Sequence, residues 1–237
     1  MKSVKLSLFA LLMFFSCSLL SRPVLAQVDL DTLPFKHIEI GPMFTAGLSI
    51  FQGDVPDGSK TDVHFAFTGG ALFAYSFHPN WGIGFGLGYE SRGMTFHPQN
   101  VDNPKQDITL NYLSVQPSLK FKQFLLGVNL GIPLSSSQTI AGATAGFADP
   151  VHFPDSYSSS FMNMMIDIRA EGLLPIVEND NGALYFIINA SYNMSDALTA
   201  FYTIGQSDSY AKAVTKNPVP TLQLGLSYML APGGKTH

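Results

Sequence analysis

The sequence predicts an all-β protein: a transmembrane antiparallel β-barrel of about eight strands that follows a cleaved signal peptide. Hydrophobic residues make up 46% of the 237 residues and charged residues only 13%, whereas soluble domains carry about 25% charged residues. Beyond the N-terminus, no stretch reaches the roughly 18 consecutive apolar residues of a membrane-spanning helix. Hydrophobicity alternates instead with a period of two, which is typical of strands. Strands can cross a membrane only as a closed barrel, because an open sheet edge leaves amide groups unpaired in hydrocarbon.

The N-terminus has the pattern of an export signal. Lys2 and Lys5 precede an apolar core at 6–20, and Ala26 ends a small-residue cleavage motif before Gln27. We therefore expect two parts, a signal peptide at 1–26 and a barrel domain at 27–237. Export combined with a barrel predicts the cell outer membrane as the location.

Eight segments alternate between an apolar face for lipid and a polar or small face for the lumen. The expected strands are 38–50, 63–77, 81–92, 108–122, 124–134, 162–174, 184–194 and 222–228. The third segment is the clearest, because bulky apolar residues at odd positions from Trp81 to Tyr89 alternate with four glycines. Inward glycines leave room in a narrow barrel for larger side chains from other strands.

The connections between these segments alternate in length. The linkers at 53–62, 97–107, 135–159 and 195–218 are long and polar, those at 78–80 and 122–123 are tight, and 175–182 is intermediate. Outer-membrane barrels have short periplasmic turns and longer outward loops, so we expect the long linkers to face outward. Aromatic residues near the short turns would then form a girdle at the membrane interface. They are Tyr75, Phe77, Trp81 and Phe121.

Two segments resemble the PorT-type outer-membrane β-barrel proteins of Bacteroidetes. They are the glycine-rich hairpin segment 82–94 and the segment 110–121. In that family a strand ending in Glu and a Gly precede a strand of the pattern Tyr-Leu-x-x-Pro-x-x-x-Lys. Tyr112, Leu113, Pro117 and Lys120 fit this pattern with one extra residue before Pro117 and one fewer after it. The resemblance implies the fold and the location; its founding member is tied to protein secretion and gliding machinery, while most relatives have no assigned activity.

Charged residues at inward positions form the main candidate site. We predict a lumen charge network of Glu39, Glu90, Arg92, Lys120, Asp167, Arg169 and Glu171. We expect Glu39, Lys120, Arg169 and Glu171 toward the periplasmic end, and Glu90 and Arg92 toward the outer end. Opposed charges in a narrow lumen can pair and close the interior. The alternative is a gated pore that rearranges these pairs.

The sequence offers little for catalysis or cofactor binding. We expect His64 to point inward near the outer end, at the height of Glu90, Arg92 and Tyr112, but no serine beside it has the spacing of a catalytic pair. The other histidines lack the spacing of a metal site, and cleavage after Ala26 would remove the single cysteine. We therefore expect no catalytic residues, no cofactor-binding residues, no metal site and no cofactor.

We predict an integral outer-membrane barrel, not an enzyme, with a structural or interaction role through its outer loops or lumen. A porin-like channel for small solutes and, less favoured, an outer-leaflet lipid-modifying enzyme are the alternatives. The expected partner is outer-membrane lipid, and a protein at the outer loops is a further candidate. Loss of Lys2, Lys5 and Arg22 with the signal peptide would take the formal net charge from −4 to −7, which argues against nucleic acid, because that partner requires clustered Lys and Arg.

Overall fold

The computed structural model describes residues 37–52, 60–97, 105–141, 162–179, 181–198 and 218–231. The chain divides into two compact units, Met1–Pro34 and Phe35–His237, and all described residues belong to the second. The predicted signal peptide and most of the long linkers lie outside the described residues. Within the described part of the chain, no helix is long and apolar enough to cross a membrane.

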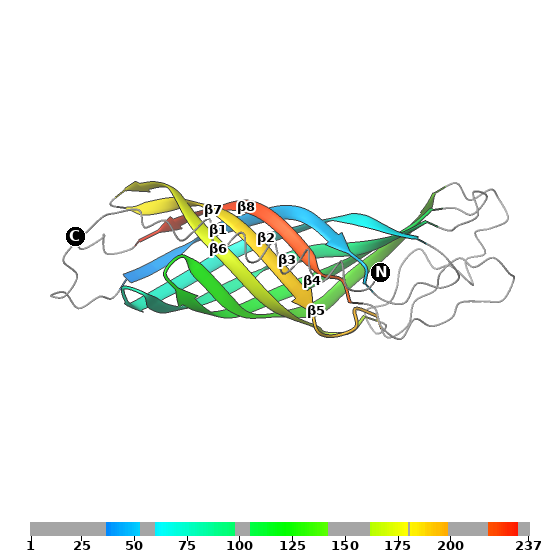
Figure 1. Ribbon diagram of the computed structural model, residues 1–237, viewed down its shortest axis with the longest axis horizontal. Coiled ribbons are helices and arrows are strands. Elements are labelled where there is room, and N and C mark those ends of the chain that lie inside the picture. Colours follow the sequence, from blue (N-terminus) through cyan, green and yellow to red (C-terminus); the bar gives the residue numbers. More distant parts are fainter. Residues whose placement is uncertain are drawn as a thin grey trace, which may run out of the picture. The chain divides into compact units, whose positions relative to one another are not determined.

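The described residues form a closed antiparallel barrel of eight strands (Figure 1). The strands are β1 (His37–Ile50), β2 (Lys60–His78), β3 (Trp81–His97), β4 (Lys105–Phe121), β5 (Phe124–Ala141), β6 (Met165–Asn179), β7 (Gly182–Asn193) and β8 (Thr221–Leu230). Each strand pairs with its neighbours in the chain, and β1 pairs with β8 to close the ring. The predicted all-β barrel is thereby confirmed.

The predicted alternation is also confirmed along the middle of the barrel. On β3 the odd positions from Trp81 to Tyr89 are exposed, whereas the glycines between them are buried. Near the tight turns, the rings of Trp81 and Phe121 lie 4.8 Å apart, and those of Tyr75 and Phe77 lie 6.3 Å apart. The predicted aromatic residues therefore lie together on β2, β3 and β4 at the end that carries the tight turns, which we call the turn end; the opposite end is the loop end.

Several strand boundaries differ from the sequence prediction. The segment 135–141 was predicted to be a linker but belongs to β5, and β6 begins at Met165 while Met162 forms an isolated bridge with Leu198. Residues 175–179 continue β6 up to a short turn before Gly182. The physical reason is that strand pairing at 135–141 uses backbone groups of β4, and this pairing needs no apolar face toward lipid.

The two faces of the sheet exchange polarity at the loop end of β2–β5. The loop-end section comprises residues 60–64, 91–97, 105–111 and 135–141. Its lumen side carries the buried residues Met94, Phe96, Ile108 and Leu110. Its outward side carries Thr95, Asp107, Thr109, Asn111, Ser135, Ser137 and Thr139. A polar outward face does not suit hydrocarbon, so this section extends beyond the apolar belt, and in Figure 1 the green strands β4 and β5 reach past β1 and β8.

Arginine substitutions on the outward face should locate the boundary between the apolar belt and the loop-end section. Phe85 lies in the middle of the apolar run of β3 and is 44% exposed, whereas Ser137 lies outward in the loop-end section. Arginine at the bilayer midplane of a barrel costs about 2–4 kcal/mol, and about 0–1 kcal/mol near the interface. We expect Phe85→Arg to lower the free energy of unfolding by about 2–4 kcal/mol and Ser137→Arg to change it little, as measured by urea unfolding in lipid vesicles. Equal losses would contradict the placement of the boundary.

Candidate functional site in the lumen

A buried charge network crosses the middle of the lumen. Arg92 on β3 is fully buried, and its guanidinium donates to Asp167 Oδ2 on β6 at 2.6 Å. It also contacts Glu90, with an Nε to Oε1 distance of 2.9 Å, and donates to the Val219 carbonyl at 3.0 Å. Because β3 and β6 are not neighbours in the ring, Arg92 links separate parts of the wall through the interior.

An amide side chain completes this central network. Asn129 on β5 donates through Nδ2 to Glu90 Oε2 at 2.8 Å and to Asp167 Oδ2 at 3.2 Å. Its Oδ1 accepts a hydrogen bond from the Ser114 hydroxyl at 2.6 Å. Buried charges are tolerated only when they are paired and hydrogen-bonded. Glu90, Arg92, Asn129 and Asp167 therefore depend on one another, and we call these four residues the central network.

A second buried polar group, centred on Gln223, connects β8 to β1, β2 and β7 by hydrogen bonds. Gln223 on β8 accepts three hydrogen bonds at Oε1, from Thr45 at 2.6 Å, from Thr68 at 3.1 Å and from Asn189 at 3.2 Å. These donors come from β1, β2 and β7. The sequence prediction considered only charged residues and missed this amide; its inward position in the alternation of β8 was the available signal.

The remaining predicted residues lie nearer the turn end in two separate pairs. Lys120 Nζ lies 2.9 Å from Glu39 Oε2, which links β4 to β1 across the lumen, and the Tyr185 hydroxyl donates to Glu39 Oε1 at 2.6 Å. Arg169 pairs with Glu171 on its own strand. The structure thus places the seven predicted residues in three groups, with only Glu90, Arg92 and Asp167 together in the centre.

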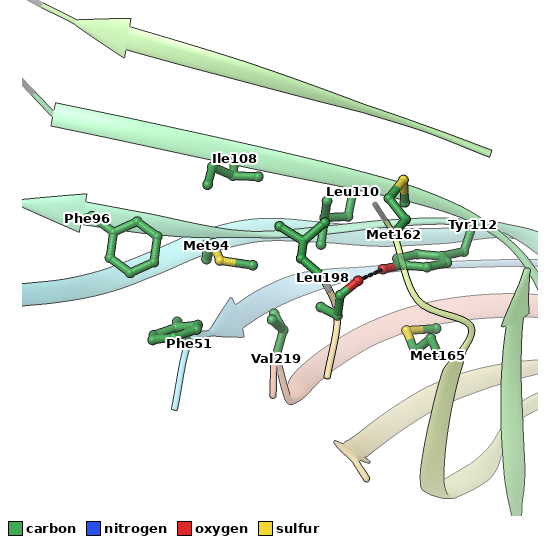
Figure 2. Close-up of a cluster of buried hydrophobic side chains, with 11 residues drawn as sticks. Phe51, Met94, Phe96, Ile108, Leu110, Tyr112, Met162, Met165, Leu198 and Val219 are labelled. Atoms are coloured by element: carbon green, nitrogen blue, oxygen red, sulfur yellow. Dashed lines mark hydrogen bonds between the residues drawn. The ribbon is translucent and has the colours of Figure 1, made fainter. Parts of the chain in front are cut away.

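An apolar cluster fills the lumen at the loop end (Figure 2). The outer apolar cluster consists of Phe51, Met94, Phe96, Ile108, Leu110, Tyr112, Met162, Met165, Ala197, Leu198 and Val219. The rings of Phe51 and Phe96 meet edge to face at 5.1 Å, and the Tyr112 hydroxyl donates to the Ala197 carbonyl at 3.4 Å. Sequence reasoning missed this cluster, because it treated the lumen as polar along its whole length.

Close packing at this cluster depends on a glycine, Gly131 on β5. A Cβ atom added to Gly131 would lie 2.6 Å from Met165 Cε and 3.1 Å from Tyr112 Cδ1. The glycine therefore lets two large side chains fill the ring where β5 approaches them. This is the role that the sequence predicted for inward glycines, found here on β5.

His64 lies on the outward face of the barrel, so its predicted inward orientation was wrong. Its ring covers Gly93, where an added Cβ atom would lie 2.5 Å from His64 Cδ2. Nδ1 lies 3.3 Å from Thr95 Oγ1, and Nε2 lies 3.2 Å from Thr109 Oγ1. The pairing of β2 with β3 shifts by one residue between Asp62 and Phe67, and a one-residue slip exchanges the two faces of a strand.

Removal of the central cation should strongly destabilise the barrel. Breaking a buried ion pair by deleting one partner typically costs about 3–5 kcal/mol, because the other charge stays buried. We expect Arg92→Met to lower the free energy of unfolding by this amount, measured by urea unfolding in lipid vesicles. Lys122→Met is the matched control, because Lys122 lies exposed in a tight turn with its amine 5.7 Å from the Phe121 ring. A similar loss in both variants would refute the stabilising role of the network.

Comparison with known proteins identifies the family. Residues 26–195 match the model of the outer membrane protein beta-barrel domain. No curated protein matches the chain. Similar solved structures include Ail of Yersinia pestis, with 16% identity, coverage of 82% of this chain and 99% of that one, and a TM-score of 0.35. OprG of Pseudomonas aeruginosa has 13% identity, coverage of 85% and 99%, and a TM-score of 0.37; Neisserial surface protein A has 9% identity, coverage of 80% and 96%, and a TM-score of 0.39.

Most of the barrel lies within the matched residues, and its apolar outward belt suits a lipid bilayer. The chain therefore belongs to the outer membrane protein beta-barrel domain family and lies in the cell outer membrane.

Proposed function

We propose that this protein is a non-conducting outer-membrane barrel with a structural or interaction role at its loop end, which faces outward. The observation that carries the proposal is the buried Arg92 side chain, which joins β3 to β6 through the middle of the lumen. The outer apolar cluster lies inside the ring at the loop end. A protein that is filled in this way interacts with its surroundings through its surface.

A channel for small solutes is the less favoured alternative. An ion would have to separate Arg92 from Asp167 and then pass the apolar side chains around Met94 and Leu198. Removing one partner of a buried ion pair costs about 3–5 kcal/mol, so opening requires a large input of free energy. An outer-leaflet lipid-modifying enzyme has weaker support, since both ring nitrogens of His64 lie within hydrogen-bond distance of threonine hydroxyls.

We further propose that the chain belongs to the PorT-type branch of outer-membrane barrels and that 1–26 is a cleaved signal peptide. The two segments that carry the resemblance are neighbours in the ring, because β3 pairs with β4 and Glu90 lies opposite Tyr112. The protein partner that we propose for this barrel binds at the outer loops. N-terminal sequencing of the mature protein that begins at Gln27 would support the cleavage site.

Conductance in planar bilayers tests the proposed closed lumen. We expect the wild-type protein, inserted as a heat-modifiable folded species, to give no discrete current steps under conditions in which a general porin gives them. Asp167→Asn removes one network charge while keeping the side-chain shape, and we expect it to be silent as well because the outer apolar cluster remains.

Regular current steps from folded wild-type protein would overturn the proposal in favour of a channel. The porin in the same bilayers controls for sensitivity, and the gel shift on heating controls for folding. Silent bilayers with both controls positive would support a non-conducting barrel.

A further inference from the structure

The outward face of the loop-end section forms an ordered polar surface directly beyond the lipid-facing belt. The outward apolar residues of β2 end with Phe65 and Val63, which are 60% and 44% exposed, and those of β3 end with Tyr89, which is 41% exposed. On β4 and β5 the corresponding residues are Leu113 and Leu134. The residues that follow them toward the loop end are polar, so this surface continues the lipid interface at the height where hydrocarbon gives way to headgroups.

A chain of hydrogen bonds fixes the middle of this surface. The Thr95 hydroxyl donates to Asp107 Oδ1 at 2.5 Å, so its oxygen is left to accept from His64 Nδ1 at 3.3 Å. With that proton on Nδ1, Nε2 accepts from the Thr109 hydroxyl at 3.2 Å. Thr109 donates its proton to the imidazole on the same outward face, and its oxygen keeps lone pairs that can accept a hydrogen bond from a ligand.

The charged groups nearest Thr109 and Asn111 are paired. Lys105 Nζ lies 3.2 Å from Asp107 Oδ2, and His97 Nε2 lies 3.4 Å from Asp62 Oδ2, while Lys60 is exposed at the start of β2, opposite His97. Around these pairs stand hydroxyl and amide groups, with Asn111 Nδ2 donating to Ser135 Oγ at 3.0 Å. A surface that selects phosphate needs unpaired cations, whereas neutral donors and acceptors in a fixed array suit the hydroxyl groups of a sugar.

We propose that this face, centred on Thr109 and Asn111, binds the saccharide headgroup of an outer-leaflet glycolipid. The occupant follows from position, because the face continues the lipid-facing belt, and from chemistry, because the groups around Thr109 and Asn111 are neutral or paired. The inference deepens the proposed interaction role and rests on its outward orientation of the loop end.

The test measures lipid binding to the folded mature chain in detergent by native mass spectrometry. The probes are dephosphorylated lipid A, intact lipid A and phosphatidylethanolamine. Two or three hydrogen bonds, each worth about 0.5–1.5 kcal/mol, correspond to about a tenfold preference in affinity or more. We expect the wild type to prefer both forms of lipid A over the phospholipid by about tenfold.

The variant Thr109→Val with Asn111→Leu removes sugar-facing groups at similar volume, and we expect it to lose this preference. Gln123→Leu, in a turn at the opposite end, should keep it. If the first variant does not fold, Ser137→Ala with Thr139→Val, at two exposed outward positions of β5, replaces it with the same expectation. No preference in the wild type, a preference that requires the phosphates, or one that persists in the folded variant would overturn the proposal.

A labelling arm separates this inference from the orientation on which it rests. Ser137→Cys in intact cells should react with a membrane-impermeant maleimide if the loop end faces outward. Labelling without a glycolipid preference would refute the saccharide site alone. Absence of labelling, with labelling restored after the outer membrane is broken, would refute the outward orientation and the glycolipid site with it.

Discussion

Closure of the hydrogen-bonded ring is the constraint on which the other features depend. The pairing of β1 with β8 removes the free edges that hydrocarbon would leave unsatisfied. A ring of eight strands is just wide enough for side chains to fill. The interior must therefore be packed like a core, and Gly131 shows the consequence, because Met165 and Tyr112 occupy the space that its side chain would take.

The side chains inside the barrel change from polar to apolar along its axis, where the outward face changes from apolar to polar. Beside the apolar belt, the lumen holds Glu90 and Asp167, which Arg92 contacts from the boundary of the loop-end section, and the wall supplies their hydrogen bonds. In the loop-end section the outward face is polar, and the lumen side holds Phe96 and Met94. That section therefore resembles the sheet of a water-soluble protein, with a polar outward face and an apolar inner face. Nearer the turn end, the same strands have the reverse pattern, which suits a membrane.

Much of the fold could be predicted because lipid imposes a period of two on every strand. Trp81 to Tyr89 alternates so regularly that its face, and hence its strand, follows from sequence alone. The bulge in β2 could not be predicted, because a one-residue shift depends on how three strands pair, and it turned His64 outward. The separation of the charged residues along the axis was predicted, but the individual pairs were not. The inward side of a strand follows from its own alternation, whereas the pairing of Lys120 with Glu39 depends on the stagger of the whole ring.

The bulge also shows how the wall stays intact where its two faces exchange polarity. Ser49 on β1 donates its hydroxyl to the Gly93 carbonyl at 2.8 Å and accepts from the Gly93 amide at 3.1 Å. Gly93 lies on β3, two strands away, at a position where no β2 residue is in register with it. The Ser49 side chain thus replaces a backbone partner. With this amide and carbonyl satisfied, His64 can cover Gly93 from outside at the point where the polar outward face begins.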